Sequence, residues 1–230
     1  MNRVFLFTVL LLGFVCTANA QESESTRAKN EADQRLYQLA LRYNDLPAAR
    51  IKLIELIDRN PTNTRYGELL ASLYFEANQF TSAAIAAMDV IEKNDKSTVA
   101  LEIAAYSLEQ LGAVDRALPY FESHYMLTGT LFSLYKAGFM QYSLNKNEEA
   151  LNSVNMLIKD KKSTEEKLGF AKADNTNQEV SMKAAALNLK GMIYMNMKNK
   201  EEARAALMEA ITLQPDFELA QSNMKEVQKM

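Results

Sequence analysis

The sequence predicts an all-α protein, an α-solenoid built from stacked helix–turn–helix repeats. Five alanines recur at spacings of 34, 34, 33 and 53 residues, and a period near 34 is typical of helical-hairpin repeats. Each stands five residues after a residue placed to turn the chain through a left-handed conformation, which Asn and Gly tolerate best. Alanine, leucine, glutamate and lysine are abundant, and no segment alternates like a β-strand. The alanines are Ala49, Ala83, Ala117, Ala150 and Ala203, and the turn residues are Asn44, Asn78, Gly112, Asn145 and Lys198.

Residues 1–20 have the three parts of a secretory signal peptide. Arg3 precedes an apolar stretch of about twelve residues, and Ala18-Asn19-Ala20 is a small-x-small cleavage motif. The apolar stretch is shorter than the roughly 18–20 residues of a membrane span. We expect cleavage after Ala20 and export to the periplasm. Lipidation of Cys16 is the less favoured alternative, because Val15 stands where a lipoprotein signal has a small residue.

Cleavage would leave a mildly acidic chain without cysteine. Removing Arg3 leaves 25 basic and 29 acidic residues, and Cys16 is the only cysteine of the sequence. This composition excludes disulfides and argues against binding to nucleic acid or to anionic membranes. The polar segment 21–29 is expected to be a flexible tail.

The last repeat, Ala184–Phe217, carries the clearest motif. It places Gly191, Tyr194, Ala203, Ala210 and Pro215 at repeat positions 8, 11, 20, 27 and 32. This pattern closely resembles the tetratricopeptide repeat (TPR), and the resemblance extends over residues 30–230. It implies a right-handed superhelix whose concave surface binds a protein or peptide.

Five repeats and one insertion follow from this register. In the first repeat, only the second half fits the pattern well. Such a departure is common in terminal repeats, which cap the stack. The insertion is polar and is expected to be a surface excursion; alternatively, Leu168 and Phe170 fold back over the groove and gate it. Thr176 and Glu179 fit a capping box that would begin the next helix. The repeats are expected at about 30–63, 64–97, 98–130, 131–164 and 184–217, with the insertion at 161–183 and a capping helix at 218–230.

The sequence offers no constellation for catalysis. His124 is the only histidine, and it occupies a helix-packing position without a second histidine or a cysteine beside it. Glu148-Glu149 and Glu201-Glu202 suit helix starts rather than a metal site. We therefore expect no enzyme activity, no metal and no cofactor.

The TPR resemblance also implies which residues line the groove. Four aromatics of the fourth repeat are spaced by 3, 4 and 3 residues, which places them on one helical face beside the core positions Leu134 and Gly138. An apolar or aromatic-bearing peptide or helix is the expected partner; the alternative is that this stripe is buried. Glu102 and Tyr135 stand where a carboxylate-binding clamp would need cations or amides, so that clamp is not expected. The predicted groove residues are Phe75, Tyr106, Phe132, Tyr135, Phe139, Tyr142, Met192 and Met195.

Together these features predict a non-catalytic protein–protein interaction adaptor of the bacterial cell envelope. One alternative is a self-associating TPR protein that buries its aromatic face in a homodimer. A third possibility is a factor in envelope lipoprotein assembly. The sequence does not identify the partner or the pathway.

Overall fold

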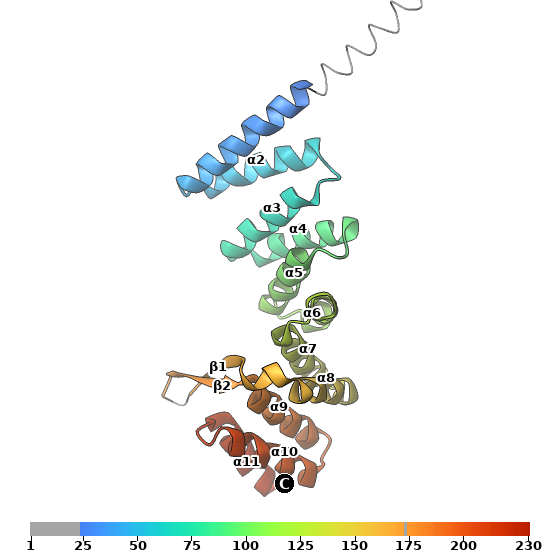
Figure 1. Ribbon diagram of the computed structural model, residues 1–230, viewed down its shortest axis with the longest axis vertical. Helices are drawn as coiled ribbons and strands as arrows, with labels where there is room; N and C mark the ends of the chain where they lie inside the picture. The colour runs from blue at the N-terminus through green and yellow to red at the C-terminus, as the bar shows by residue number, and fades with distance from the viewer. Residues whose placement is uncertain (1–23, 173) are drawn as a thin grey trace, which may run out of the picture. The chain divides into compact units, whose positions relative to one another are not determined.

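The computed structural model describes residues 24–172 and 174–230 and has the predicted all-α helical-repeat fold (Figure 1). The predicted signal peptide and Cys16 lie outside the described residues. The chain divides into two compact units, the first ending at Asp95 and the second comprising Lys96–Met230. Each unit is considered by itself below.

The first unit consists of two helical hairpins. Residues 24–42 are helical, including 24–29, where the sequence analysis expected part of a flexible tail. No glycine or proline interrupts these residues, and Arg27 pairs with Glu31 one turn later at 3.1 Å, so the helix extends toward the N-terminus. A core of Tyr37, Ala49, Leu53, Leu56, Leu70 and Leu73 joins the helices. The helices that follow are α2 (Leu46–Arg59), α3 (Thr64–Glu76) and α4 (Phe80–Lys93).

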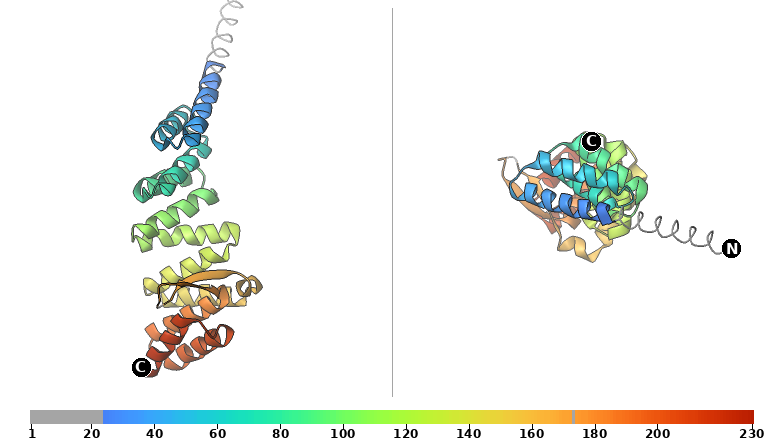
Figure 2. Two further views of the ribbon diagram at one scale, coloured as in Figure 1. Left: turned by 90° about the vertical axis from the view of Figure 1, so that its left-hand side faces the viewer. Right: turned by 90° about the horizontal axis from the view of Figure 1, so that it is seen from above.

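The second unit contains three more hairpins, a short insertion and a final helix (Figures 1 and 2). Helices α5 and α7 begin at Thr98 and Leu131, the first residues of the predicted third and fourth repeats. The elements are α5 (Thr98–Gln110), α6 (Val114–Thr128), α7 (Leu131–Ser143), α8 (Asn147–Lys159), the 3₁₀ helix η1 (Lys161–Thr164), β1 (Lys167–Ala171), β2 (Asn177–Ser181), α9 (Met182–Asn196), α10 (Lys200–Leu213) and α11 (Glu218–Lys229).

The turn residues adopt the left-handed conformation that the sequence predicted. Their φ angles are 56° at Asn44, 57° at Asn78, 72° at Gly112, 58° at Asn145 and 60° at Lys198. The alanine that follows each turn is fully buried, with 0% of its surface exposed. The small side chain therefore lies at the contact between the two helices of each hairpin.

In the last hairpin a glycine makes this contact still closer. A Cβ atom added to Gly191 of α9 would lie 2.5 Å from Cγ of Leu207 in α10. Leu207 is fully buried and cannot move aside freely. The small residue predicted at this position is therefore required by the packing of the two helices.

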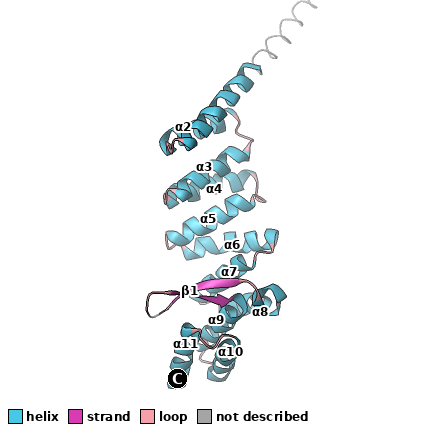
Figure 3. Ribbon diagram, turned by 60° about the vertical axis from the view of Figure 1, so that its left-hand side comes forward, coloured by secondary structure: helices cyan, strands magenta, loops and turns pink. Residues whose placement is uncertain are grey.

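The insertion forms a β-hairpin, which the sequence analysis did not predict (Figure 3). Strands β1 and β2 are antiparallel, with Leu168 opposite Val180. Both side chains are buried in a cluster that includes Leu131 and Leu187, so the insertion adds to the core of the unit. In β2 the buried residues Gln178 and Val180 alternate with exposed neighbours, which is the period of two of a strand with one face packed on a core.

The predicted capping box at Thr176 and Glu179 is wrong. Thr176 lies in the turn between the strands and donates its hydroxyl to Asp174 at 2.6 Å. Helix α9 instead begins after Ser181, whose hydroxyl accepts a hydrogen bond from the backbone N–H of Ala184 at 3.3 Å.

The β-hairpin is fixed to the last repeat. The ring of Phe170 packs edge-on against Phe217, with 5.0 Å between ring centroids. The side-chain amide of Gln178 donates to the Asp216 carbonyl at 3.0 Å. Phe139 remains 41% exposed, whereas Leu168 and Phe170 pack with the cluster that contains Leu131 and Leu187.

Candidate functional site

The predicted groove residues are divided between the two units. Phe75 lies on α3 of the first unit, where its ring packs edge-on against Phe80 at 5.6 Å. The other seven lie on α5, α7 and α9 of the second unit. The seven residues that share the second unit therefore define the predicted groove.

Tyr106 and Phe132 form a packed aromatic group at one end of these helices. Their rings are stacked with centroids 6.3 Å apart. Nζ of Lys136 lies 5.9 Å from the Tyr106 centroid and 5.6 Å from that of Phe132, and it pairs with Glu109 at 2.7 Å. Burial, reinforced by the carboxylates of Glu102 and Glu109, raises the pKa of Tyr106 to about 12. These two rings are held by packing.

Tyr135 and Phe132 are also more enclosed than expected. Both are partly buried and pack against the cluster that contains Leu131, Leu134 and Leu168. Burial of the Tyr135 hydroxyl raises its pKa above the usual range. The expectation that the aromatic stripe is separate from the core is therefore wrong at these two positions, because α9 and the β-hairpin bring additional apolar side chains beside α7.

Three predicted residues meet in a recess at the other end of the unit. Tyr142 of α7 and Met192 and Met195 of α9 line a cavity of about 430 Å³. The ring of Phe139 lies 6.2 Å from that of Tyr142 and extends the apolar surface beyond the cavity. We call this cavity the C-terminal pocket; it is lined by Tyr142, Met192, Met195, Asn196, Lys198, Asn223, Glu226, Lys229 and Met230.

Helix α11 supplies one wall of the C-terminal pocket. Its residues Asn223, Glu226 and Lys229 are spaced by three residues and share one helical face, and Met230 follows the end of the helix. The sequence pattern predicts only a capping helix here, and these lining residues were not among the predicted groove residues. The three-residue spacing of polar side chains in residues 218–230 is the signal that could have predicted this wall of the pocket.

Hydrogen bonds between asparagines hold the pocket in shape. Asn188 is 1% exposed; its amide donates to Sδ of Met192 at 3.6 Å, and its oxygen accepts from Asn223 at 2.8 Å. Asn196 donates to the side chains of Asn145 and Asn147 at 3.0 and 3.1 Å. The lining side chains are thus oriented before any ligand arrives.

A second and larger cavity lies in the first unit. It has a volume of about 830 Å³ and lies among helix 24–42, α2 and α3. The sequence analysis missed it because the first helix of the first repeat fits the repeat pattern poorly. We call it the N-terminal pocket; it is lined by Glu31, Gln34, Arg35, Tyr37, Gln38, Leu39, Arg42, Leu53, Leu56, Asn63, Arg65, Tyr66 and Leu69.

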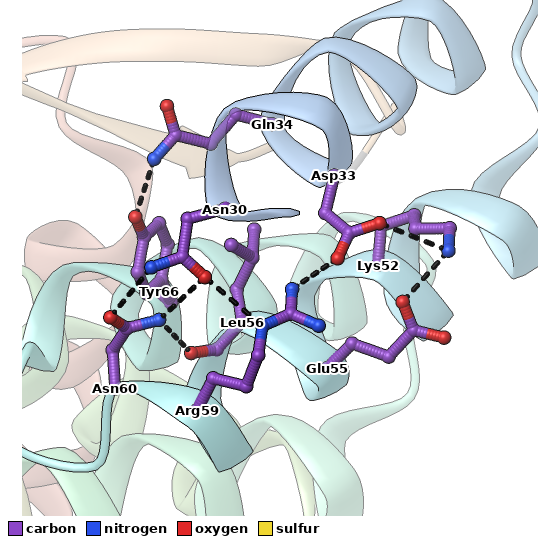
Figure 4. A network of polar contacts seen from close by, with 9 residues as sticks. All are labelled: Asn30, Asp33, Gln34, Lys52, Glu55, Leu56, Arg59, Asn60 and Tyr66. Carbon is purple, nitrogen blue, oxygen red and sulfur yellow. Dashed lines mark hydrogen bonds and ion pairs between the residues drawn. The ribbon is translucent and has the colours of Figure 1, made fainter. Parts of the chain in front are cut away.

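The helix that forms this pocket is fixed by a polar network (Figure 4). The carboxylate of Asp33 is 11% exposed and binds Arg59 and, at 3.1 Å, Lys52. Asn30 and Asn60 exchange hydrogen bonds of 2.9 and 3.2 Å. Burial alone would raise the pKa of Asp33, but the hydrogen bonds and charges of Arg59 and Lys52 hold that pKa below its usual value.

The histidine has a structural environment. His124 is 7% exposed, and its Nδ1 lies 2.8 Å from the Ser133 hydroxyl, a contact between α6 and α7. Over residues 24–172 and 174–230, no three His, Cys, Asp or Glu side chains gather as metal ligands would. Within the same ranges, none of the helices combines the length and the apolarity of a membrane span.

These features define a class of protein: a helical-hairpin repeat protein with preformed recesses on its helices. Residues 184–217 match the tetratricopeptide repeat family model, and these are the residues of the predicted last repeat. The chain therefore contains a tetratricopeptide repeat at these residues.

Solved structures share this fold at low sequence identity. YrrB, described as a TPR protein with an unusual peptide-binding site, is 17% identical with a TM-score of 0.65, over 82% of this chain and 88% of YrrB. MamA is 14% identical with a TM-score of 0.61, over 81% of this chain and 92% of MamA. A TPR protein from Parabacteroides merdae is 14% identical with a TM-score of 0.61, over 86% and 72% of the two chains. A search of curated protein sequences found no match.

Proposed function

We propose that this chain is a non-catalytic scaffold that binds a protein partner through the C-terminal pocket and the adjoining Phe139. The observation that carries the proposal is the grouping of Tyr142, Met192 and Met195 in one cavity. Methionine adapts its shape to apolar side chains, and tyrosine adds a rigid ring with a polar end. The partner segment is expected to insert an apolar or aromatic side chain.

The polar rim would orient that segment. Asn196, Asn223 and Lys229 surround the apolar floor and can bond to the backbone of a peptide. The similarity to YrrB supports a binding role for the fold in general, since YrrB is described as having a peptide-binding site.

Site-specific photo-crosslinking tests this proposal. A photoreactive amino acid at Phe139 should capture a partner in the native cells, whereas the same amino acid at Met156 should not. Met156 is a matched control because it is similarly exposed, at 48% against 41%, and lies on α8 outside the pocket. Equal capture at both positions would exclude the pocket as the binding site.

The variant Phe139→Glu should weaken capture by at least about tenfold, because it places a charge on an apolar contact. It should not lower the melting temperature, because the side chain of Phe139 is 41% exposed. A variant that fails to fold would contradict the exposed position of Phe139. If the captured partner is a second copy of the chain, the protein is instead a self-associating scaffold, and sedimentation would show a concentration-dependent dimer.

We further propose that the protein works in the cell envelope of a bacterium. The support is the signal-peptide pattern of residues 1–20. N-terminal sequencing of the protein from its own cells should find Gln21 as the first residue. An intact N-terminus in the cytoplasmic fraction would exclude export.

A further inference from the structure

The N-terminal pocket is lined by three arginines. Arg35 and Arg42 come from helix 24–42, and Arg65 comes from α3. In the part of the chain that the structure describes, no salt bridge joins any of the three to a carboxylate. A concave surface therefore holds an excess of positive charge in a chain whose net charge is −3.

Two acidic residues of the same helix, Glu31 and Asp33, are engaged with cations other than the three arginines. Asp33 is bound to Arg59 and Lys52, and Glu31, which lines the pocket, pairs with Arg27 at 3.1 Å. Burial raises the pKa of Tyr37, and the carboxylate of Glu76 raises it further. The charge of Arg65 lowers the pKa of Tyr37. The charges of Glu76 and Arg65 therefore both reach the pocket wall at Tyr37, with opposite signs.

Between the arginines the pocket is apolar. Leu39 is 44% exposed and lies between Arg35 and Arg42 on one face of the helix. Leu53 and Leu56 form a fully buried floor. Gln34 donates to the Tyr66 hydroxyl at 2.5 Å and fixes one edge (Figure 4). The pocket therefore offers cations at two ends and apolar surface in the middle.

The spacing of the arginines predicts the shape of a ligand. Arg35 and Arg42 are seven residues apart on a helix, so their Cα atoms are about 10 Å apart along its axis. A peptide in the extended polyproline II conformation rises about 3.1 Å per residue with three residues per turn, so side chains three residues apart lie on the same side, about 9 Å apart. Guanidinium groups bind carboxylates through paired, charge-assisted hydrogen bonds.

We propose that the N-terminal pocket binds an extended acidic segment of a protein partner, in which two carboxylates three residues apart flank apolar side chains. The carboxylates pair with Arg35 and Arg42, Arg65 adds charge from α3, and the apolar side chain contacts Leu39. This site is separate from the C-terminal pocket, and its function does not depend on the function proposed there.

A labelled peptide tests this site directly. The probe is a fluorescein-labelled peptide in which two glutamates flank a leucine and a phenylalanine, with glycine and serine at the ends. Fluorescence anisotropy is measured on protein purified from cells that express the full chain. We expect saturable binding that weakens as salt is added. Replacing both glutamates of the peptide with glutamine should weaken binding by at least about tenfold, since each charge-assisted bond contributes on the order of one decade in affinity.

Variants of the protein locate the binding. Arg35→Gln and Arg42→Gln should each weaken peptide binding by about tenfold. Lys29→Gln is the matched control, because Lys29 is an exposed cation of the same helix outside the pocket, and it should change binding by less than about twofold. Circular dichroism should show unchanged helicity in all three, since none of the salt bridges among residues 24–172 and 174–230 involves these side chains. Phe139→Glu should bind this peptide like the wild type, which separates this test from that of the C-terminal pocket.

Four results would overturn the proposal. They are binding that does not saturate, equal binding of the glutamine peptide, equal binding by the two arginine variants, and a Phe139→Glu variant that no longer binds the probe. Vesicles of phosphatidylglycerol serve as a competing anionic surface. If the vesicles bind the wild type but not the Arg35→Gln and Arg42→Gln variants, and the peptide does not bind at all, the pocket binds lipid. The proposal that it binds an acidic peptide is then wrong.

Discussion

The side-chain oxygen of Gln178 accepts a hydrogen bond from the backbone N–H of Glu218, at 3.2 Å and 40 residues further along the chain. Helix α11 begins at Glu218, and its N-cap residue, Phe217, offers no side-chain acceptor. A residue of the β-hairpin thus caps the final helix of the chain. The insertion and the final helix therefore stabilise each other.

Gln178→Ala should destabilise the second unit by about 1–3 kcal/mol, because it removes two hydrogen bonds from a side chain that is 9% exposed. Thermal unfolding measures the loss, and hydrogen exchange should quicken at the first turn of α11. Asn177→Ala, a change at the exposed neighbour, serves as the control and should have little effect. Equal effects of the two variants would contradict the capping role.

Gly191→Ala should destabilise the protein by about 1–3 kcal/mol, although alanine favours helices, because the new Cβ would lie 2.5 Å from Leu207 Cγ. The measurement is the midpoint of denaturant unfolding. Gly169→Ala is the matched control, since an added Cβ there meets nothing within 4 Å. A Gly191→Ala variant as stable as the control would show that α9 and α10 can separate without cost.

Asp33→Asn should loosen helix 24–42 at neutral pH, because it removes the carboxylate that binds Arg59 and Lys52. The pKa of Asp33 is lowered in the folded protein, so its stabilising effect is complete above the ordinary carboxyl pKa near 3.9 and is lost as pH falls through the folded-state value. The melting temperature of the variant should be a few degrees lower at pH 7 and should approach that of the wild type below about pH 4. Asp58→Asn, an exposed change on α2, should follow the wild type at every pH.

Tyr106 should make the second unit sensitive to alkali. Its pKa of about 12 exceeds the ordinary value of 10.0, so the folded state keeps the proton longer than the unfolded state does. Stability from this residue is complete below pH 10 and falls as pH rises from about 10 to about 12. Tyr106→Phe keeps the ring and should reduce the slope of stability against pH in that range, whereas Tyr43→Phe, at a residue that is 69% exposed, should not.

Much of the fold could be predicted from the sequence because the repeat period is local. Asn44, Asn78 and Gly112 turn the chain through left-handed conformations that few residues tolerate, and the alanine after each turn is buried as expected. The β-hairpin was missed because its strands have only five residues each and lie within a polar stretch. Its stability comes from Phe217 and Asp216, which are far away in the sequence.

The site was harder to predict for a similar reason. Helical spacing correctly placed Phe132, Tyr135 and Phe139 on α7, but spacing cannot show which of them a neighbouring helix will enclose. Only Phe139 of these three is classed as exposed. The pocket walls at Asn223 and Arg35 depend on packing between helices, and they could be found only from the structure.

Lys198 has a left-handed backbone, with φ of 60°, at a turn where the other hairpins have asparagine or glycine, and its side chain lines the C-terminal pocket. A lysine in this conformation is less stable than asparagine or glycine would be, by about 1 kcal/mol. An ordinary search for thermostable variants would therefore select Lys198→Asn or Lys198→Gly early. The same substitution would remove a cation from the rim of the C-terminal pocket. A single change at Lys198 would therefore raise the melting temperature and weaken the binding of a partner.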